Sequence, residues 1–332
     1  MNKINQGIIL FKMNRSLLSD YFIENQIKTE FRDNSSWVIL SPIEQSIKRK
    51  IEEIGTPLKD WNVNIYRGIL TGYNEAFIIS GEKRTELLAA CGTEKERIRT
   101  DELIRPILRG RDIKRYTYEF ADLYLIATFP AKHYNIDDYP AIKAHLLSYG
   151  IERLEQTGKE YTINGEKIKA RKKTNNQWFE TQDSISYWDD FSKQKILWKR
   201  VGSILRFCYD DTGCMGLDST CFAIGNHVRY LLAVLNSPIG HYQLQNSPQT
   251  GTGDLLISVQ ALEPIYIPIP DEKLEKNVVT LINEIVISHN NKTIHIVEER
   301  INKLIFTAYH LTEEEISFIK ESTRNISSSV KP

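Results

Sequence analysis

Apolar residues at helical spacing mark the clearest element near the start of this chain. Ile47, Ile51 and Ile54 lie three or four residues apart, directly after the segment Ser41-Pro42-Ile43-Glu44. A Ser cap, a Pro at the first helical position and a Glu three residues after the Ser form a capping box. Gly55 and Pro57 then break the pattern. The sequence therefore predicts a helix over residues 42–54.

Short apolar runs and alternating apolar and polar residues predict strands through the first two thirds of the chain. The predicted strands are 7–11, 61–65, 76–79, 123–127, 196–201 and 204–209. Helical patterns between them predict helices at 84–91, from Thr100 to a break at Pro106, at 139–149 and at 228–235.

The strand patterns end at a proline-rich stretch, Pro264 to Pro270. Beyond it, apolar residues at steps of three and four predict two long helices packed as a hairpin. A second capping box at Thr312-Glu313-Glu314-Glu315 starts a short last helix. We expect an α+β fold, with a mixed α/β domain at about 37–264 and a C-terminal helical hairpin within 265–332.

Composition narrows the class of protein only broadly. The 332 residues correspond to about two domains, and no apolar run approaches the roughly 18 residues of a membrane span. Four cysteines form no disulfide framework, so we expect a cytoplasmic protein without a membrane partner. Charge is uneven: from Arg97 to Arg206, 21 Lys and Arg residues stand against 15 Asp and Glu. A basic middle fits contact with phosphate groups.

The sequence shows no set of catalytic or metal-binding residues. None of the 11 prolines is adjacent to another, so the Asn-Pro-Pro-aromatic motif of adenine-N6 methyltransferases is absent, as is a G-x-G-x-x-G fingerprint. Cys208, Cys214 and Cys221 lack zinc-site spacing. The segment Pro270-Asp271-Glu272-Lys273 has the letters of a nuclease motif but starts a helix. We therefore predict no catalytic residue, metal or cofactor in this chain.

Clustered basic and amide side chains are the candidates for binding a polyanion. Arg forks bind phosphate or guanine, and Asn and Gln bind adenine. The candidates are Arg67, Thr71 and Asn74 on a glycine-flanked loop, Arg109, Arg111, Lys114, Arg115 and Tyr116 on a second loop, and Lys169, Arg171, Lys172 and Lys173 on a basic loop that we expect to be flexible. A structural alternative stays open, in which an Arg beside Asp112 is simply paired with it and Asn74 caps a turn.

At the same positions the chain resembles a known family. The segments 55–61 and 67–77 resemble the opening of the TaqI-like C-terminal specificity domain, the target-recognition part of adenine-specific DNA methyltransferases and of fused restriction–modification enzymes. Further similar segments follow in order at 104–113, 139–142, 178–180, 195–198, 230–237, 268–270 and 311–316. The resemblance covers about residues 37–320.

This resemblance implies sequence-specific recognition of double-stranded DNA on behalf of a methyltransferase or nuclease catalytic domain or subunit. Residues 1–36 resemble the end of a methyltransferase catalytic domain with a linker, and the rest of that domain is missing. The chain would thus be a non-catalytic part of a bacterial restriction–modification system, and S-adenosylmethionine would bind to the catalytic partner. Residues 37–264 would be the DNA target-recognition domain.

Two other classes of function stay open on the sequence alone. The chain could be a self-sufficient metal-dependent endonuclease whose active site has no recognisable motif. It could also be a protein-interaction scaffold, with the helical hairpin as its functional surface and the basic loops as ordinary solvated surface.

Overall fold

The computed structural model describes residues 40–288 and 291–327. Contacts divide the chain into two units, Met1–Glu53 and Ile54–Pro332, and each is described by itself. The predicted strand at 7–11 and the predicted methyltransferase remnant at 1–36 lie outside the described residues.

The predicted helix at 42–54 is confirmed as α3 (Pro42–Ile54). Its capping box is formed as expected: the Ser41 N–H donates to Glu44 Oε2 (2.7 Å), and the Glu44 N–H donates to Ser41 Oγ (3.4 Å). Ile47 and Ile51 are buried. The apolar spacing and the capping residues therefore agree in setting this helix.

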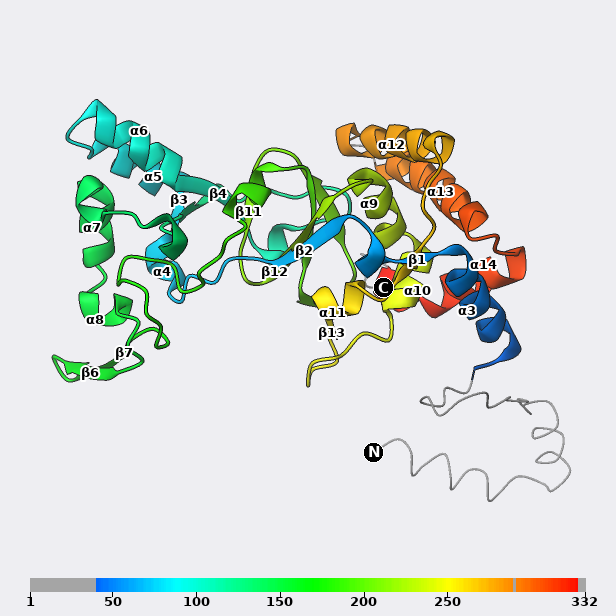
Figure 1. Ribbon diagram of the computed structural model, residues 1–332, viewed down its shortest axis with the longest axis horizontal. Helices are drawn as coiled ribbons and strands as arrows, with labels where there is room; N and C mark the ends of the chain where they lie inside the picture. The colour runs from blue at the N-terminus through cyan, green and yellow to red at the C-terminus, as the bar shows by residue number, and fades with distance from the viewer. Residues whose placement is uncertain (1–39, 289–290, 328–332) are drawn as a thin grey trace, which may run out of the picture. The chain divides into compact units, whose positions relative to one another are not determined.

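A four-stranded antiparallel sheet in the order β10-β8-β12-β2 forms the centre of the second unit (Figure 1). Its strands are β2 (Val63–Arg67), β8 (Lys195–Lys199), β10 (Phe207–Asp210) and β12 (Thr220–Gly225). Strands β8 and β10 confirm the predictions at 196–201 and 204–209, with shorter bounds. Every residue of β10 is buried, so this sheet belongs to the core.

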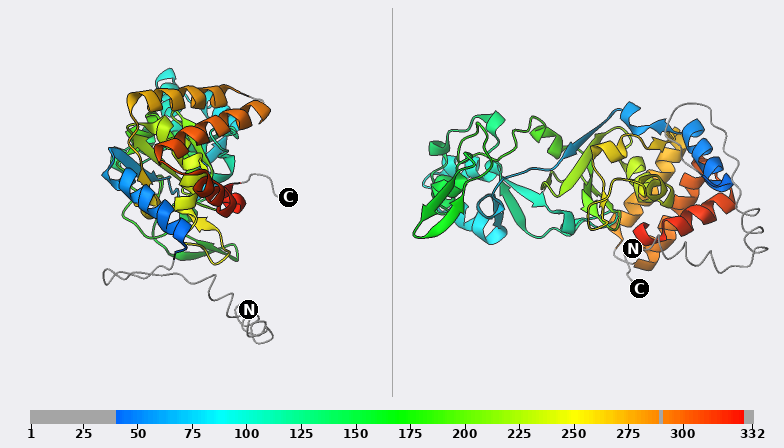
Figure 2. Two further views of the ribbon diagram at one scale, coloured as in Figure 1. Left: turned by 90° about the vertical axis from the view of Figure 1, so that its right-hand side faces the viewer. Right: turned by 90° about the horizontal axis from the view of Figure 1, so that it is seen from below.

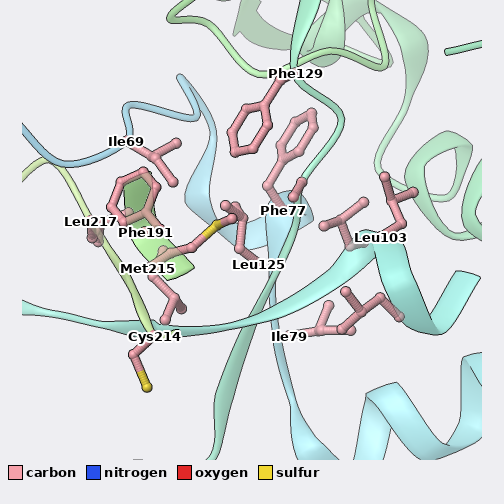
Figure 3. Packing of buried hydrophobic residues seen from close by; sticks show 14 of the residues in the cluster. Ile69, Phe77, Ile79, Leu103, Leu125, Phe129, Phe191, Cys214, Met215 and Leu217 are labelled. Carbon is pink, nitrogen blue, oxygen red and sulfur yellow. The ribbon is translucent and has the colours of Figure 1, made fainter. Parts of the chain in front are cut away.

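A second sheet has the order β11-β4-β5-β3 and carries short helices. Its strands are β3 (Ile78–Ser80), β4 (Ile104–Leu108), β5 (Leu123–Ile126) and β11 (Met215–Gly216). The helices around it are α4 (Asn74–Phe77), α5 (Gly81–Ala89), α6 (Glu94–Leu103), α7 (Pro140–Leu147) and α8 (Ile151–Leu154). Phe77, Leu103, Leu125 and Met215 pack together between these elements (Figure 3).

Two sequence-based predictions in this region are wrong. The predicted strand 76–79 begins as helix α4, and only Ile78 and Ile79 enter a strand. The helix predicted to start at Thr100 instead starts at Glu94 and ends at Leu103. Its N-cap is Thr93, whose side chain accepts a hydrogen bond from the Glu96 N–H at 3.1 Å. Pro106 lies in β4, so it breaks no helix.

The basic stretch 167–173, predicted to be a flexible loop, begins within the second strand of a β-hairpin, which consists of β6 (Glu160–Ile163) and β7 (Glu166–Lys169). Asn164 and Gly165 both have positive φ (52° and 84°). An Asn-Gly pair with this geometry makes the two-residue turn that favours a hairpin. This signal was present in the sequence and was missed.

The predicted C-terminal helices are confirmed. They are α9 (Val228–Asn236), α12 (Glu272–Ile287), α13 (Asn291–Ala308) and α14 (Glu313–Ser322). Three further short helices were not predicted: α10 (Pro238–Leu244), α11 (Val259–Leu262) and α15 (Arg324–Ser327). Helices α12 and α13 pack against each other as a hairpin (Figures 1 and 2). The capping box of α14 forms between Thr312 and Glu315.

Two short strand pairs connect distant parts of the chain. Strand β1 (Thr56–Pro57) pairs with β14 (Tyr266–Ile267), and β9 (Val201–Gly202) pairs with β13 (Leu255–Leu256). The first pair joins the predicted domains 37–264 and 265–332, whose boundary stays a prediction. Among the described helices, none is long and apolar enough to cross a membrane.

Candidate nucleic-acid interface

Basic side chains meet at one end of the sheet β10-β8-β12-β2. Arg67 is the last residue of β2, and Lys199 is the last residue of β8. Both flank the start of β12, where Cys221 pairs with Arg67 and Thr220 pairs with Lys199. Arg200 follows Lys199 directly. The strand register therefore brings three basic residues from two distant segments to the same end of the sheet.

A short turn, η2 (Gly110–Asp112), adds a fourth cation to this end of the sheet. The Gly110 N–H donates to Ser219 Oγ at 3.1 Å. A Cβ built on Gly110 would lie only 2.8 Å from Lys199 Cγ, so the turn packs directly on Lys199. Arg111 is exposed and forms no hydrogen bond or salt bridge within the described residues. We call this group the basic cluster: Arg67, Arg111, Lys199 and Arg200.

Two carboxylates partly compensate the basic cluster. Arg67 Nη2 lies 3.7 Å from Asp218 Oδ2, and the two side chains are 42% and 30% exposed. Burial raises the pKa of Asp183, whereas the Arg67 charge acts to lower it. An exposed ion pair of this length contributes little to stability. Arg67 can therefore exchange Asp218 for a phosphate or a base at low cost.

Arg109 is held by an internal partner. Its Nε donates to Asp112 Oδ2 (3.0 Å) and its Nη2 donates to Oδ1 (2.8 Å), which is the forked geometry that Arg would need for guanine. Asp112 is 5% exposed. Burial acts to raise the pKa of Asp112, and the hydrogen bonds from Arg109 outweigh it, so this pKa is lowered. The structural alternative for Arg109 is therefore the one that the contacts favour.

The lowered pKa of Asp112 predicts a pH-dependent contribution to stability. A carboxyl with a lowered folded-state pKa stabilises the protein above its unfolded pKa of about 3.9, and the stabilisation is lost as the pH falls through the folded value. We expect Asp112→Asn to lower the free energy of unfolding by about 1.5–3 kcal/mol at pH 7. Urea unfolding at pH 7 and pH 3 should show this difference shrinking in acid. A difference that is equal at both pH values would contradict the assignment.

Arg115 and Tyr116 of the second predicted binding loop are engaged with the protein interior. Arg115 Nε lies 2.6 Å from Glu298 Oε1, and its Nη2 donates to the Asn236 carbonyl at 2.6 Å. Tyr116 is 1% exposed, and its N–H donates to the Phe207 carbonyl. These side chains therefore have little surface to offer DNA, which corrects the expectation for this part of the loop. Lys114 is partly exposed and lies 3.0 Å from Glu119.

Arg171, predicted on a flexible loop, is buried at 4% exposure. Its guanidinium donates five hydrogen bonds to the backbone carbonyls of Leu154, Thr71, Trp178 and Glu180. Burial lowers its pKa to about 10. Arg171 is thus unavailable to DNA in this fold, and it joins the loop after β2 to the segments at 154 and 178–180.

The first predicted binding loop is held by hydrogen bonds among its own residues. Thr71 is fully buried, and its hydroxyl donates to Asn74 Oδ1 at 2.6 Å. The Tyr73 N–H donates to Thr71 Oγ1 at 3.2 Å. Asn74 is exposed, but its carbonyl oxygen is engaged in this turn. Of the three residues predicted here, Arg67 is the one that reaches the basic cluster.

Three lysines of the basic segment remain open to solvent. Lys169, Lys172 and Lys173 are all exposed. The charge of Lys172 acts to lower the pKa of Asp183, as does that of Arg67, so Lys172 lies near the basic cluster.

Sequence reasoning missed Lys199 and Arg200, which were read as part of the strand 196–201. The signal was a pair of consecutive cations that ends the apolar run Ile196-Leu197-Trp198. Within residues 40–288 and 291–327, no three His, Cys, Asp or Glu side chains group as metal ligands would. Cys208, Cys214 and Cys221 are buried free thiols.

Residues 105–269 match the family model of the TaqI-like C-terminal specificity domain. The chain contains a TaqI-like C-terminal specificity domain. Three members of the basic cluster lie within this specificity domain, and Arg67 precedes it.

Two solved structures are similar to this chain. One is the type IIL restriction-modification enzyme MmeI in complex with DNA, with a TM-score of 0.53 and 11% sequence identity over 82% of this chain and 37% of that chain. Another is the type IIG restriction endonuclease BpuSI, with a TM-score of 0.38 and 11% identity over 81% of this chain and 34% of that chain. The similarity to MmeI concerns the fold, and this chain spans 37% of the length of the MmeI chain. No curated protein matches the sequence.

Proposed function

We propose that this chain recognises a sequence in double-stranded DNA for a restriction–modification system and directs an adenine-N6 methyltransferase to it. The specificity domain and the fold shared with MmeI support a role in DNA recognition. The observation that carries the proposal is the basic cluster, in which cations from two strand ends and a turn lie at one end of the sheet.

The members of the basic cluster suit different contacts with DNA. Arg67 and Arg111 present planar forks, which bind a phosphate or the O6 and N7 atoms of guanine. Lys199 is a point charge on a flexible stem and suits phosphate. The internal pair of Arg109 with Asp112 holds the turn that carries Arg111. Phosphate contacts would position the chain on the duplex, and base contacts would give specificity.

Catalysis would belong to a separate methyltransferase or nuclease domain or subunit. That partner would bind S-adenosylmethionine and extrude the target adenine from the duplex. This chain would act in the cytoplasm as the non-catalytic part, and its role would be to select which adenine is offered.

The salt dependence of DNA binding tests the proposal. Each phosphate contact contributes about 0.9 to the slope of log K against log salt concentration. We expect Arg111→Ala/Lys199→Ala to lower this slope by about 1–2 if one or both side chains contact phosphate. Fluorescence anisotropy with a labelled duplex between 50 and 200 mM salt would measure the slopes.

The matched control is Lys95→Ala/Lys276→Ala, which removes the same charge from exposed helical positions outside the cluster. This control should keep the wild-type slope. Equal losses in the two double variants would mean a nonspecific charge effect and would overturn the assignment of the cluster. Cleavage of plasmid DNA by the purified chain with magnesium would contradict its non-catalytic role.

A further inference from the structure

Residues 246–254 form a polar loop whose base adjoins the basic cluster. Strand β13, which follows the loop, pairs with β9, so that Leu255 lies opposite Gly202. A Cβ built on Gly202 would lie 3.4 Å from Lys199 Cδ, and the Ile257 N–H donates to the Arg200 carbonyl at 2.8 Å. The loop is therefore attached to the same strand end that carries Lys199 and Arg200.

Internal hydrogen bonds give this loop a defined shape. The Thr250 N–H donates to the Asp254 carbonyl (2.9 Å), and the Gly253 N–H donates to the Thr250 carbonyl (2.9 Å). The Asp254 N–H donates to Thr250 Oγ1 (3.2 Å). A Cβ on Gly251 or Gly253 would meet no described atom within 4 Å. The loop is thus a turn held by its own hydrogen bonds, and its tip at Gly251 and Gly253 is open space.

The side chain of Gln249 is the feature of this loop that suits base recognition. It is exposed and forms no hydrogen bond within the described residues. Two other amides are engaged: Asn74 accepts from Thr71, and Asn176 Nδ2 donates to the carbonyls of Thr181 and Gln182. Gln249 therefore keeps both its donor and its acceptor for a ligand.

We infer that Gln249 is a specificity-determining residue that reads a base edge in the DNA. This inference rests on the proposed function and deepens it. A free amide can accept from the N6 amino group of adenine and donate to N7, which makes adenine its preferred base in the major groove. The backbone of Gln249 pairs with Leu255, which lies opposite Gly202 just after Lys199 and Arg200. A duplex bound to the basic cluster would therefore bring a base edge within reach of Gln249.

Selection from a randomised duplex library, followed by sequencing of the retained DNA, tests this inference on the full chain. We expect the wild-type protein to select a motif, and Gln249→Ala to reduce the preference for adenine at one position of that motif by about 5- to 150-fold. Gln249→Glu should shift the preference at this position toward cytosine, because a carboxylate accepts from the N4 amino group. The salt slope should stay at its wild-type value in both variants.

Gln194→Ala is the matched control, because Gln194 is exposed at the opposite end of β8 from Lys199. This variant should select the wild-type motif. If Gln249→Ala and Gln249→Glu also select the unchanged motif, the inference is overturned and the proposed function stands. If the wild-type protein retains no duplex, both are overturned.

Discussion

Arg171→Met is expected to lower the free energy of unfolding by about 4 kcal/mol or more. The substitution removes five donated hydrogen bonds and leaves the carbonyls of Thr71, Leu154 and Trp178 without this partner in the interior. Each buried polar group that loses its partner costs about 1–3 kcal/mol. Met matches the length of the Arg stem, so lost packing is a minor part of the effect. Urea unfolding followed by tryptophan fluorescence would measure it.

Lys172→Met is the neighbouring control, because Lys172 is exposed and its loss should change stability by no more than about 0.5 kcal/mol. Arg171→Lys should recover only part of the loss, since an ammonium group has three donors and lacks the planar fork. If Arg171→Met and Lys172→Met unfold at the same urea concentration, Arg171 does not organise this region.

Lys195→Met is the second substitution with a large expected effect. Lys195 and Asp210 form a salt bridge in which both side chains are fully buried. Lys195 Nζ also donates to the Phe191 carbonyl, and Asp210 accepts from Tyr118. Removing one partner of a buried pair leaves an uncompensated charge and costs about 3–5 kcal/mol.

The pH dependence identifies the cause of this loss. Burial acts to raise the pKa of Asp210, and in the wild-type protein the charge of Lys195 outweighs it and lowers this pKa. Without Lys195, burial should raise the pKa of Asp210. Lowering the pH should then protonate the buried carboxylate of the variant and reduce its loss of stability. We expect the stability difference between wild type and Lys195→Met to be largest near pH 7 and to narrow toward pH 4.

Lys193→Met serves as the control, because Lys193 is 61% exposed and pairs with Asp190 on the surface. It should change stability little at either pH. The double variant Lys195→Met/Asp210→Asn should lose less than the sum of its two single variants, because the pair interacts directly. A gap between wild type and Lys195→Met that is constant with pH would show that lost packing causes the effect.

Local signals predicted the helices well. The capping boxes at Ser41 and Thr312 and the apolar spacing after them correctly predicted α3 and α14. The error at Thr100 arose because Thr93 offers an equally good cap with Glu96 at the third position. The missed hairpin at 160–169 was likewise a local signal, the Asn164-Gly165 turn.

The candidate site was predictable by residue type but not by environment. Arg67, Arg109, Arg111, Arg115 and Arg171 look alike in the sequence. In the structure Arg111 is exposed without a partner among the described residues, whereas Arg171 is buried on backbone carbonyls and Arg109 forks onto Asp112. The pairing of an Arg with Asp112 and the turn at Asn74 were alternatives that sequence spacing could raise, because Arg109 and Thr71 each lie three residues from their partner.

The sequence by itself determined the α+β class, the position of the C-terminal helices and the family resemblance, because these depend on periodicity, caps and motifs within short segments. Only the tertiary structure decided which cations meet. Arg67, Arg111 and Lys199 lie far apart along the chain, and they converge because β12 pairs with both β2 and β8 while Gly110 packs on Lys199. Burial and strand register arise from contacts between distant segments, and no local pattern encodes them.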